Sequence, residues 1–370
     1  MHLRNAAALL LTAAAACMLV TGCKPAEEKQ LTERELVSAL PSEETPDSVV
    51  TQDNIIYAVY KDHAAVIGYN ALFSKEQITF PEKVEDKPLT EICNQSSVIP
   101  LSLTRVTIPE GVTTIGDDAF KSCNELASIS LPSSLAYVGK DAFAGTQWMR
   151  SMQATKKLII VNSILIDGVT ADGSADDNGS DPGRIVIPSG VTCIAGNAFR
   201  NSSKPTDVFI PDSVIRIGEG AFQGCKNLKK VRFGLNPSLR EIDGCAFKGS
   251  GIVSVSLPGK LRSIGDEAFS SCGFLSEVWL PGSLTTIGDE AFYRCSSLEE
   301  IEIPARVSEI GQKAFKYCEN LTCVAVFGNT CTFPGADTFP AGNPDLILYG
   351  KQDSATQSYA EKCGLRFEAY

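Results

Sequence analysis

An Ala-Phe pair that recurs about every 23 residues is the feature that most constrains how this chain can fold. Its phenylalanines are Phe120, Phe143, Phe199, Phe222, Phe247, Phe269, Phe292 and Phe315. Six of the seven intervals measure 22 to 25 residues, and the interval from Phe143 to Phe199 measures 56. A unit this short cannot bury its own apolar side chains, so successive units must stack into a solenoid.

The first half of each unit predicts a short strand. In residues 298–321, Ile301 and Ile303 alternate with charged residues, which is the pattern of a strand with one buried side. Pro304 follows directly and ends the strand, because it has no N–H to donate. Equivalent strands in stacked units would pair side by side in a parallel sheet.

The second half of the unit predicts a return to the core. Val307 and Ile310 are the next apolar residues, and Gly311 is expected to make a tight turn. The pair Ala314-Phe315 is expected to pack inside a short helical or 3₁₀ segment. The fold class predicted is therefore a β-rich leucine-rich-repeat solenoid, built on a parallel sheet of short strands and capped at both ends.

The segments outside the regular repeat complete the domain organisation. We divide the chain into a signal peptide, a flexible tether, an N-terminal cap with a degenerate repeat, a solenoid with one insertion, and a C-terminal cap. The boundaries are 1–22, 23–53, 54–100, 101–345 with the insertion at 148–183, and 346–370. Strands are expected at 56–60, 65–67, 157–161, 163–167 and 346–350, and a short helix at 354–363.

The N-terminus indicates export and lipid anchoring. An apolar run from Ala6 to Val20 follows Arg4 and is too short to span a bilayer. The sequence Val20-Thr21-Gly22-Cys23 is similar to a bacterial lipobox, so we expect Cys23 to become the lipidated N-terminus. The alternative is an ordinary secretory signal with an incidental cysteine. The segment Lys24-Pro25-Ala26-Glu27-Glu28 follows Cys23 directly, and its acidic residues resemble a tag for the outer leaflet.

The repeat resembles that of the BspA-like (Treponema pallidum type) leucine-rich repeat family, whose units read roughly L-x-x-I-x-I-P-x-x-V-x-x-I-G-x-x-A-F-x-x-C. Segments 126–143, 208–225 and 275–318 match closely, and the likeness extends over about residues 55–370. The resemblance implies a bacterial surface lipoprotein or secreted protein. Some members of the family adhere to host matrix proteins such as fibronectin and fibrinogen, or mediate coaggregation.

The cysteines follow the repeat. The chain has thirteen. Five of them lie three residues after a repeat phenylalanine: Cys123, Cys225, Cys272, Cys295 and Cys318. We predict a structural ladder of buried thiols, with disulfides between neighbouring coils as the alternative. Cys323, Cys331 and Cys363 lie off the ladder and are the better disulfide candidates.

Catalysis, metal binding and nucleic-acid binding are not indicated. After removal of the signal peptide His63 is the one histidine, and no hydrolase, phosphate-loop or zinc-protease motif occurs. No cofactor is expected. The acidic segment 172–181 lacks EF-hand spacing and is interpreted as a solvated loop, with calcium binding as the alternative. The net charge of −11, without a basic cluster, argues against nucleic acid as a partner.

The outward positions of the strands offer the candidate ligand site. Strand alternation points one column of side chains away from the core, and this column contains Phe209, Arg232 and Trp279. These residue types are enriched at interface hot spots. Scattered exposed aromatic residues are the plainer interpretation. The candidate ligand-binding residues are Phe209, Lys230, Arg232, Glu277, Trp279 and Glu302.

Two functions remain open at this point. The first is a lipid-anchored adhesion or protein-binding module, expected as a monomer on the outer membrane or cell surface, whose partner is a host or bacterial surface protein. The alternative is a non-catalytic glycan-binding or scaffold lipoprotein of an uptake system. The sequence does not identify the ligand. Identifying it by experiment would distinguish the two functions.

Overall fold

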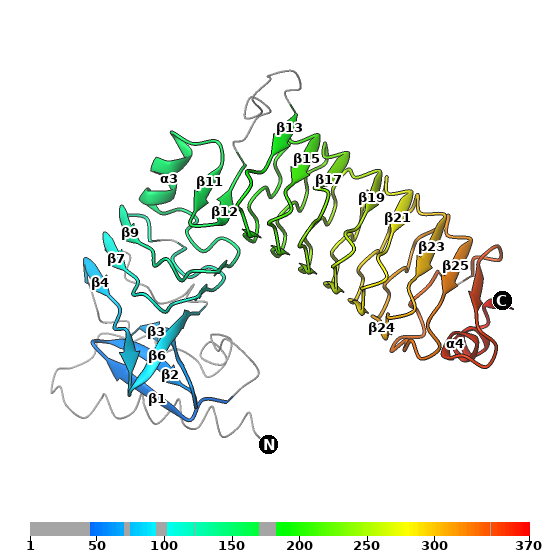
Figure 1. The fold of residues 1–370 in the computed structure, drawn as a ribbon, viewed down its shortest axis with the longest axis horizontal. Helices are drawn as coiled ribbons and strands as arrows, with labels where there is room; N and C mark the ends of the chain where they lie inside the picture. The colour runs from blue at the N-terminus through cyan, green and yellow to red at the C-terminus, as the bar shows by residue number, and fades with distance from the viewer. Residues whose placement is uncertain (1–44, 70–74, 94–101, 122, 170–182, 341) are drawn as a thin grey trace, which may run out of the picture. The chain divides into compact units, whose positions relative to one another are not determined.

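The computed structural model describes residues 45–69, 75–93, 102–121, 123–169, 183–340 and 342–370. The chain divides into two compact units, Met1–Lys156 and Lys157–Tyr370 (Figure 1). The predicted signal peptide, the anchor Cys23, most of the tether and the acidic segment 172–181 lie outside the described residues.

The second unit carries the predicted sheet of short strands. The strand after each coil's leucine pairs in parallel with its counterpart in the next coil, in two consecutive sheets (Figure 1). The first contains β13 (Arg184–Val186), β15 (Asp207–Ile210), β17 (Lys230–Phe233), β19 (Ser254–Ser256) and β21 (Glu277–Trp279). The second contains β23 (Glu300–Ile303), β25 (Cys323–Val326), β26 (Ile347–Gly350) and β27 (Arg366–Ala369).

A further parallel sheet runs along the second unit and is formed by the Val-x-x-Ile segments. Each coil contributes a strand of two residues whose isoleucine is buried and pairs with the isoleucine of the next coil. These strands are β14 (Cys193–Ile194), β16 (Arg216–Ile217), β18 (Glu241–Ile242), β20 (Ser263–Ile264), β22 (Thr286–Ile287) and β24 (Glu309–Ile310). The sheet begins with the hairpin β11 (Ile159–Val161) and β12 (Ile164–Asp167), so the strands predicted in the insertion are confirmed.

The Ala-Phe segments form a third ladder between coils. From Phe199 to Phe292, the N–H of each repeat phenylalanine donates to the carbonyl of the alanine in the next coil, for example Phe269 to Ala291 at 2.7 Å, and the N–H of Phe315 donates to Thr338 at 2.8 Å. The phenylalanine rings of the second unit stack face to face, with centroids 4.9 to 5.5 Å apart. All of these rings are buried, so they form the continuous core that the repeat predicts.

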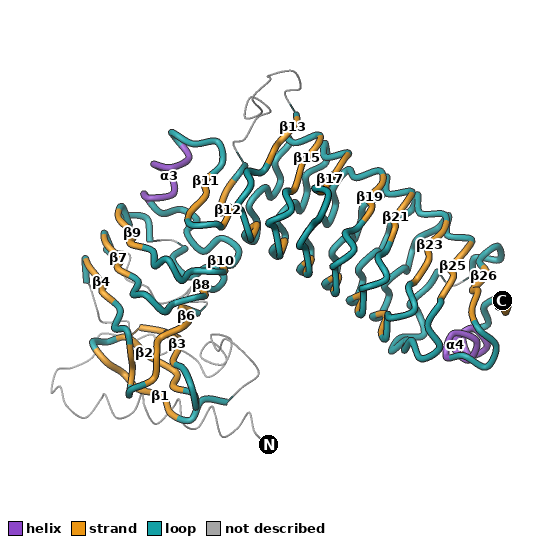
Figure 2. Tube along the Cα trace, viewed as in Figure 1, coloured by secondary structure: helices purple, strands orange, loops and turns teal. Residues whose placement is uncertain are grey.

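The predicted helical or 3₁₀ conformation of these segments is wrong, because they are successive hydrogen-bonded turns (Figure 2). In the coil of Gly311, two residues have a left-handed backbone: Lys313 with φ 54° and Tyr317 with φ 63°. Neighbouring coils repeat this at equivalent positions, as at Glu290 and Arg294. These turns direct alternate N–H groups toward the next coil, which a helix could not do, since its N–H groups bond within the segment.

The repeat glycine has a different role from the tight turn predicted for Gly311. Its φ is not left-handed, and the chain of the previous coil lies too close for a side chain. A Cβ on Gly288, the equivalent residue one coil earlier, would lie 2.6 Å from the backbone nitrogen of Asp266. Close approach between coils therefore requires glycine at this position.

The first unit begins with antiparallel strands and continues as coils. The strands β1 (Ser48–Gln52), β2 (Ile55–Val59) and β3 (Ala64–Tyr69) form a meander. β3 then pairs in parallel with β6 (Lys87–Ile92), which also pairs with β5 (Lys83–Val84). The predicted tether is thus too long, because its last residues pair as β1 with β2.

The remaining elements of the first unit repeat the pattern of the second. β6 pairs with β8 (Thr114–Ile115), which pairs in turn with β10 (Tyr137–Val138). Both strands lie just before the glycine of the repeat. A separate sheet contains β4 (Gln77–Thr79), β7 (Arg105–Thr107) and β9 (Ser128–Ser130). These are the first strands of their coils, as β13 to β21 are in the second unit, and we call such sheets first-strand sheets. The helix α3 (Gln147–Gln153) is capped by Thr146, whose hydroxyl accepts from the Met149 N–H.

The C-terminal cap agrees with its prediction. The helix α4 (Ala355–Cys363) begins after Ser354, whose hydroxyl accepts from the Gln357 N–H, and ends at Gly364 with φ 68°. Buried Tyr359 and Ala360 cover the apolar core at the end of the solenoid. Within the described part of the chain, neither helix has the length and apolarity needed to cross a membrane.

The glycine position gives a testable prediction. Gly288→Ala should lower the free energy of unfolding by about 2 kcal/mol, because the new methyl group forces the coils apart. Gly282→Ala is the matched control: no atom lies within 4 Å of its Cβ position, so its effect should stay below about 0.5 kcal/mol. Urea unfolding followed by circular dichroism measures both, and equal effects would contradict this role of Gly288.

Candidate functional site

The outward residues of the first-strand sheets form the candidate binding surface, here called the sheet face. Register pairs Val186 with Phe209 and Phe209 with Arg232, and Ser256 with Trp279. The predicted column is therefore confirmed from Val186 to Arg232 and from Ser256 to Trp279. The sheet face consists of Arg184, Val186, Asp207, Phe209, Lys230, Arg232, Ser254, Ser256, Glu277, Trp279, Glu300 and Glu302.

Arg232 is held in place by its neighbour in the adjacent strand. Its guanidinium forms a bidentate ion pair with the Asp207 carboxylate. Nε donates to Oδ1 at 2.9 Å, and Nη2 donates to Oδ2. About half of the Arg232 side chain remains exposed. A bidentate pair fixes the guanidinium plane, so Arg232 presents a preoriented cation beside the half-buried Phe209.

Trp279 lies apart from these two residues. It is 54% exposed, the outward side chain of β21, and β19 separates it from the strand of Arg232. At the usual strand spacing, two steps place the two residues about 10 Å apart. β19 itself carries serines at both outward positions, Ser254 and Ser256. The structure thus brings Phe209 and Arg232 together, whereas Trp279 stands beyond a strand of small side chains.

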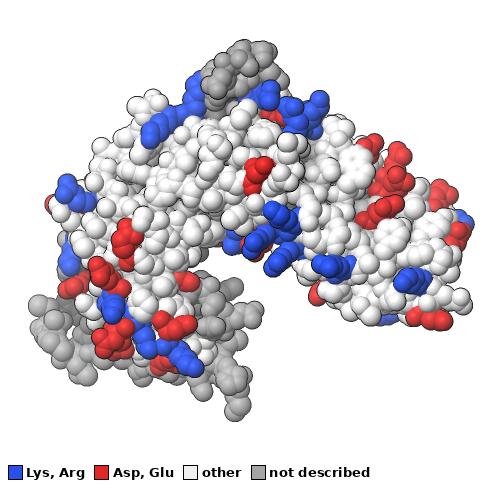
Figure 3. All heavy atoms as spheres, in the orientation of Figure 1, with Lys and Arg blue, Asp and Glu red and all other residues white. Residues whose placement is uncertain are grey.

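The charges on the sheet face are divided along the unit. Lys230 and Arg232 lie on β17, whereas Glu277 lies on β21 and Glu300 and Glu302 on β23. Figure 3 shows the same division, with basic side chains over β15 and β17 and acidic ones near β21 and β23. Among the residues that the structure describes, no ion pair engages the side chains of these three glutamates. Their charge is therefore open to a partner.

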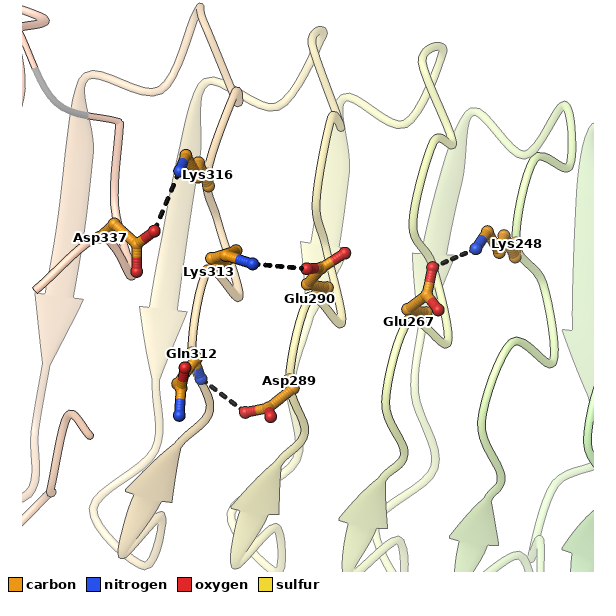
Figure 4. Close-up of polar contacts among 8 residues, drawn as sticks. All are labelled: Lys248, Glu267, Asp289, Glu290, Gln312, Lys313, Lys316 and Asp337. Carbon is orange, nitrogen blue, oxygen red and sulfur yellow. Dashed lines mark hydrogen bonds and ion pairs between the residues drawn. The ribbon is translucent and has the colours of Figure 1, made fainter. Parts of the chain in front are cut away.

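Charged side chains on the Ala-Phe turns form contacts between neighbouring coils. Lys313 pairs with Glu290 at 3.2 Å and Lys316 with Asp337 at 2.9 Å, each across one coil boundary (Figure 4). The Asp289 carboxylate accepts the Gln312 N–H at 2.6 Å, again from the next coil. These contacts hold neighbouring coils together.

The sequence analysis did not identify Phe274, which is 62% exposed. The ammonium of Lys229, one strand position away from Lys230, lies 4.5 Å from the centre of its ring. The signal was present in the sequence, because the second residue after the ladder cysteine is polar in other coils, as in Asn227 and Ser297. Phe274 adds an exposed ring beside the strand that carries Trp279.

The cysteine ladder consists of residues at equivalent positions in successive coils. Its thiols are buried and donate to the carbonyl of the phenylalanine in the preceding coil. The sulfur-to-oxygen distances are 3.0 Å for Cys225, 3.1 Å for Cys272, 3.2 Å for Cys295 and 3.1 Å for Cys318. Cys123 is buried at the same position in the first unit. Burial raises the pKa of Cys225 to about 12 and that of Cys272 to about 11, so these thiols stay protonated at neutral pH.

The disulfide candidates are all free thiols in the structure, as are the ladder cysteines. The three candidates lie in different parts of the last coils. Cys323 faces outward on β25, Cys331 is fully buried within its coil, and Cys363 is the last residue of α4. Burial raises the pKa of Cys331 to about 12.

His63 contacts two neighbouring residues of the N-terminal cap. Its Nδ1 lies 2.8 Å from the Asp62 carboxylate, and its ring stacks on Tyr60 with centroids 4.6 Å apart. The contact with His63 lowers the pKa of Asp62. No serine or cysteine contacts this imidazole in the described residues, and no group of three or more histidine, cysteine or acidic side chains is arranged to hold a metal ion there.

Comparison with known proteins decides the family. The sequence model described as "BspA type Leucine rich repeat region" matches in six copies over residues 51–166 and 184–322. The chain belongs to the BspA-type leucine-rich repeat family. The resemblance found in the sequence and the fold class of the solenoid are thereby established. The comparison with curated proteins found no match.

Solved structures of bacterial repeat proteins are similar over most of the chain. A leucine-rich repeat protein from Bacteroides ovatus is 21% identical, with 86% of this chain and 99% of that chain covered and a TM-score of 0.31. A leucine rich cell surface protein from Faecalibacterium prausnitzii is 19% identical, with 86% and 98% covered and a TM-score of 0.31. The T. pallidum leucine-rich repeat protein is 21% identical, with 75% and 91% covered and a TM-score of 0.27. Membership of the family rests on the sequence match alone.

The thiols of this BspA-type solenoid give a second testable prediction. Near pH 8, iodoacetamide should alkylate half-buried Cys323 and Cys363 at least roughly a hundredfold faster than Cys225, Cys272 and Cys295, because buried thiols form little thiolate. Mass spectrometry of native protein measures the rates, and the urea-unfolded chain is the control in which all sites react. Fast labelling of the ladder in folded protein would contradict its packing.

Proposed function

We propose that this chain is a cell-surface protein-binding module that recognises its partner through the sheet face. The observation that carries the proposal is the 54% exposed Trp279, which lies between a preoriented Arg232 and the unpaired carboxylates of Glu300 and Glu302. Tryptophan and arginine are the side chains most enriched at binding hot spots. Because β15 pairs with β17 and β19 pairs with β21, Arg232 and Trp279 are held in position before a partner arrives.

The expected cellular context follows from the N-terminal sequence and the family. We propose attachment to the outer membrane or cell surface by lipidation of Cys23, with the solenoid displayed outside the cell. Host matrix proteins are the proposed ligand class, because some members of the BspA-type family bind them. Leucine-rich repeat solenoids are generally binding scaffolds without catalysis, and the proposal assigns no reaction and no cofactor to this chain.

The same exposed ring could stack against a sugar, which makes a glycan-binding lipoprotein the second candidate. Trp279 has the polar neighbours Ser256 and Glu302 in the next strands, which suits hydroxyl-rich ligands as well as protein surfaces. The two candidates differ in what they bind, so one experiment separates them.

The proposal predicts a specific loss on mutation. Binding of the full chain, solubilised in non-ionic detergent, to immobilised fibronectin and fibrinogen should weaken roughly thirtyfold in Trp279→Ala, the loss typical of a hot-spot residue. Tyr317→Ala is the matched control, because Tyr317 is 44% exposed but lies on the Ala-Phe turns. Surface plasmon resonance measures the affinities.

A glycan array with the same two variants completes the test. Binding to glycans alone would contradict the protein-binding function and favour the second candidate. Equal losses in Trp279→Ala and Tyr317→Ala would contradict the sheet face as the binding surface.

A further inference from the structure

We propose that the sheet face of residues 157–370 also associates with the sheet face of a second copy of this chain, in a two-fold symmetric dimer. This inference rests on the proposed function in one respect, since it uses the same exposed surface. It replaces the monomer expected from the sequence.

Charge is the first argument. The strand β17 carries Lys230 and Arg232 outward, with Lys229 just before it, and the only acid facing them from β15 is Asp207. The strand β23 carries Glu300 and Glu302 outward. One region is therefore positive and the other negative, three strands away, and the glutamates have no ion-pair partner among the described residues of their own copy. Such a division fits a partner with the opposite order of charges.

A second copy has that order when it is rotated about an axis parallel to the strands and lying between β19 and β21. This rotation reverses the order of coils but keeps each residue's place along its strand. It sets β17 of one copy over β23 of the other. Arg232 then faces Glu302 and Lys230 faces Glu300, and each pair occurs twice because the interface is isologous.

Side-chain size is the second argument, and it is independent of charge. The same rotation sets β21 over β19, so the protruding Trp279 faces Ser256, one of two small outward residues on β19. It also sets β15 over β25, so Phe209 faces Ala325. A large side chain thus meets a small one in both places, which is the packing that a close interface requires.

Trp279 lies near the centre of the proposed interface. The ion pairs between β17 and β23 lie on either side of it. Exposed charge pairs are screened by salt, so the dimer should dissociate more readily as ionic strength rises. Its formation also competes with capture of another protein at the same face, and a ligand in excess would displace the second copy.

Sedimentation equilibrium of the full chain in density-matched non-ionic detergent tests the dimer. Lys230→Glu and Glu300→Lys should each weaken association at least tenfold, since each reversal places like charges together in both symmetric contacts. The double variant Lys230→Glu/Glu300→Lys should recover the wild-type constant to within about threefold, because the exchanged charges attract again. Arg262→Glu is the control: this exposed arginine precedes β20 of the other sheet and should leave association unchanged.

The recovery of the double variant decides the outcome, because misfolding of a single variant would not be repaired by the second change. A chain that stays monomeric at every concentration, a dimer that Arg262→Glu weakens equally, or a double variant without recovery would each overturn the inference. Fibronectin binding that is lost in Trp279→Ala in a monomeric chain would leave the proposed function standing.

Discussion

The register between neighbouring coils is the constraint on which the rest of this structure depends. Each coil satisfies much of its backbone through its neighbours, because the first strand, the second strand and the Ala-Phe turn bond to the equivalent segment of the next coil, except that β21 and β23 belong to separate sheets. The stacked phenylalanine rings and the thiols of the cysteine ladder lie inside these three ladders. A shift of one coil against the next would break all of them together, so register is specified at every step.

The same register builds the proposed binding surface. It places one outward side chain of each coil above the next, so residues far apart in sequence, such as Phe209 and Arg232, become neighbours. The core residues are nearly the same in every coil, whereas the outward residues differ from coil to coil, and this is where Trp279 and the divided charges occur. The fold thus separates the residues that determine stability from those that we propose determine binding.

The sequence predicted the path of the chain well because its signal was periodic. The strands near Ile301, the cap helix after Ser354 and the buried position of Cys295 all followed from the apolar spacing and capping residues. The conformation of the turns could not be predicted in this way. Glu290 and Arg294 adopt left-handed φ values, and their N–H groups donate to the carbonyls of Gln312 and Lys316 in the next coil. Contacts between coils are not visible in one coil's sequence.

The sequence predicted which residues of the candidate site face outward, but not how their side chains lie relative to one another. Strand alternation placed Trp279 and Arg232 outward, but the gap left by Ser254 and Ser256 and the Asp207 contact appear only when the strands are aligned. The exposed Phe274 lies outside the strand pattern, so alternation could not reveal it.

Amide hydrogen exchange resolved to single residues tests the stacking of coils most directly. The N–H groups of Phe222, Phe247, Phe269 and Phe292 lie in turns, yet each donates to the next coil. Our account predicts that they exchange roughly a thousandfold or more slowly than an unstructured chain, as slowly as amides of the strands. Exchange of these four amides at the rate of open surface turns would contradict it.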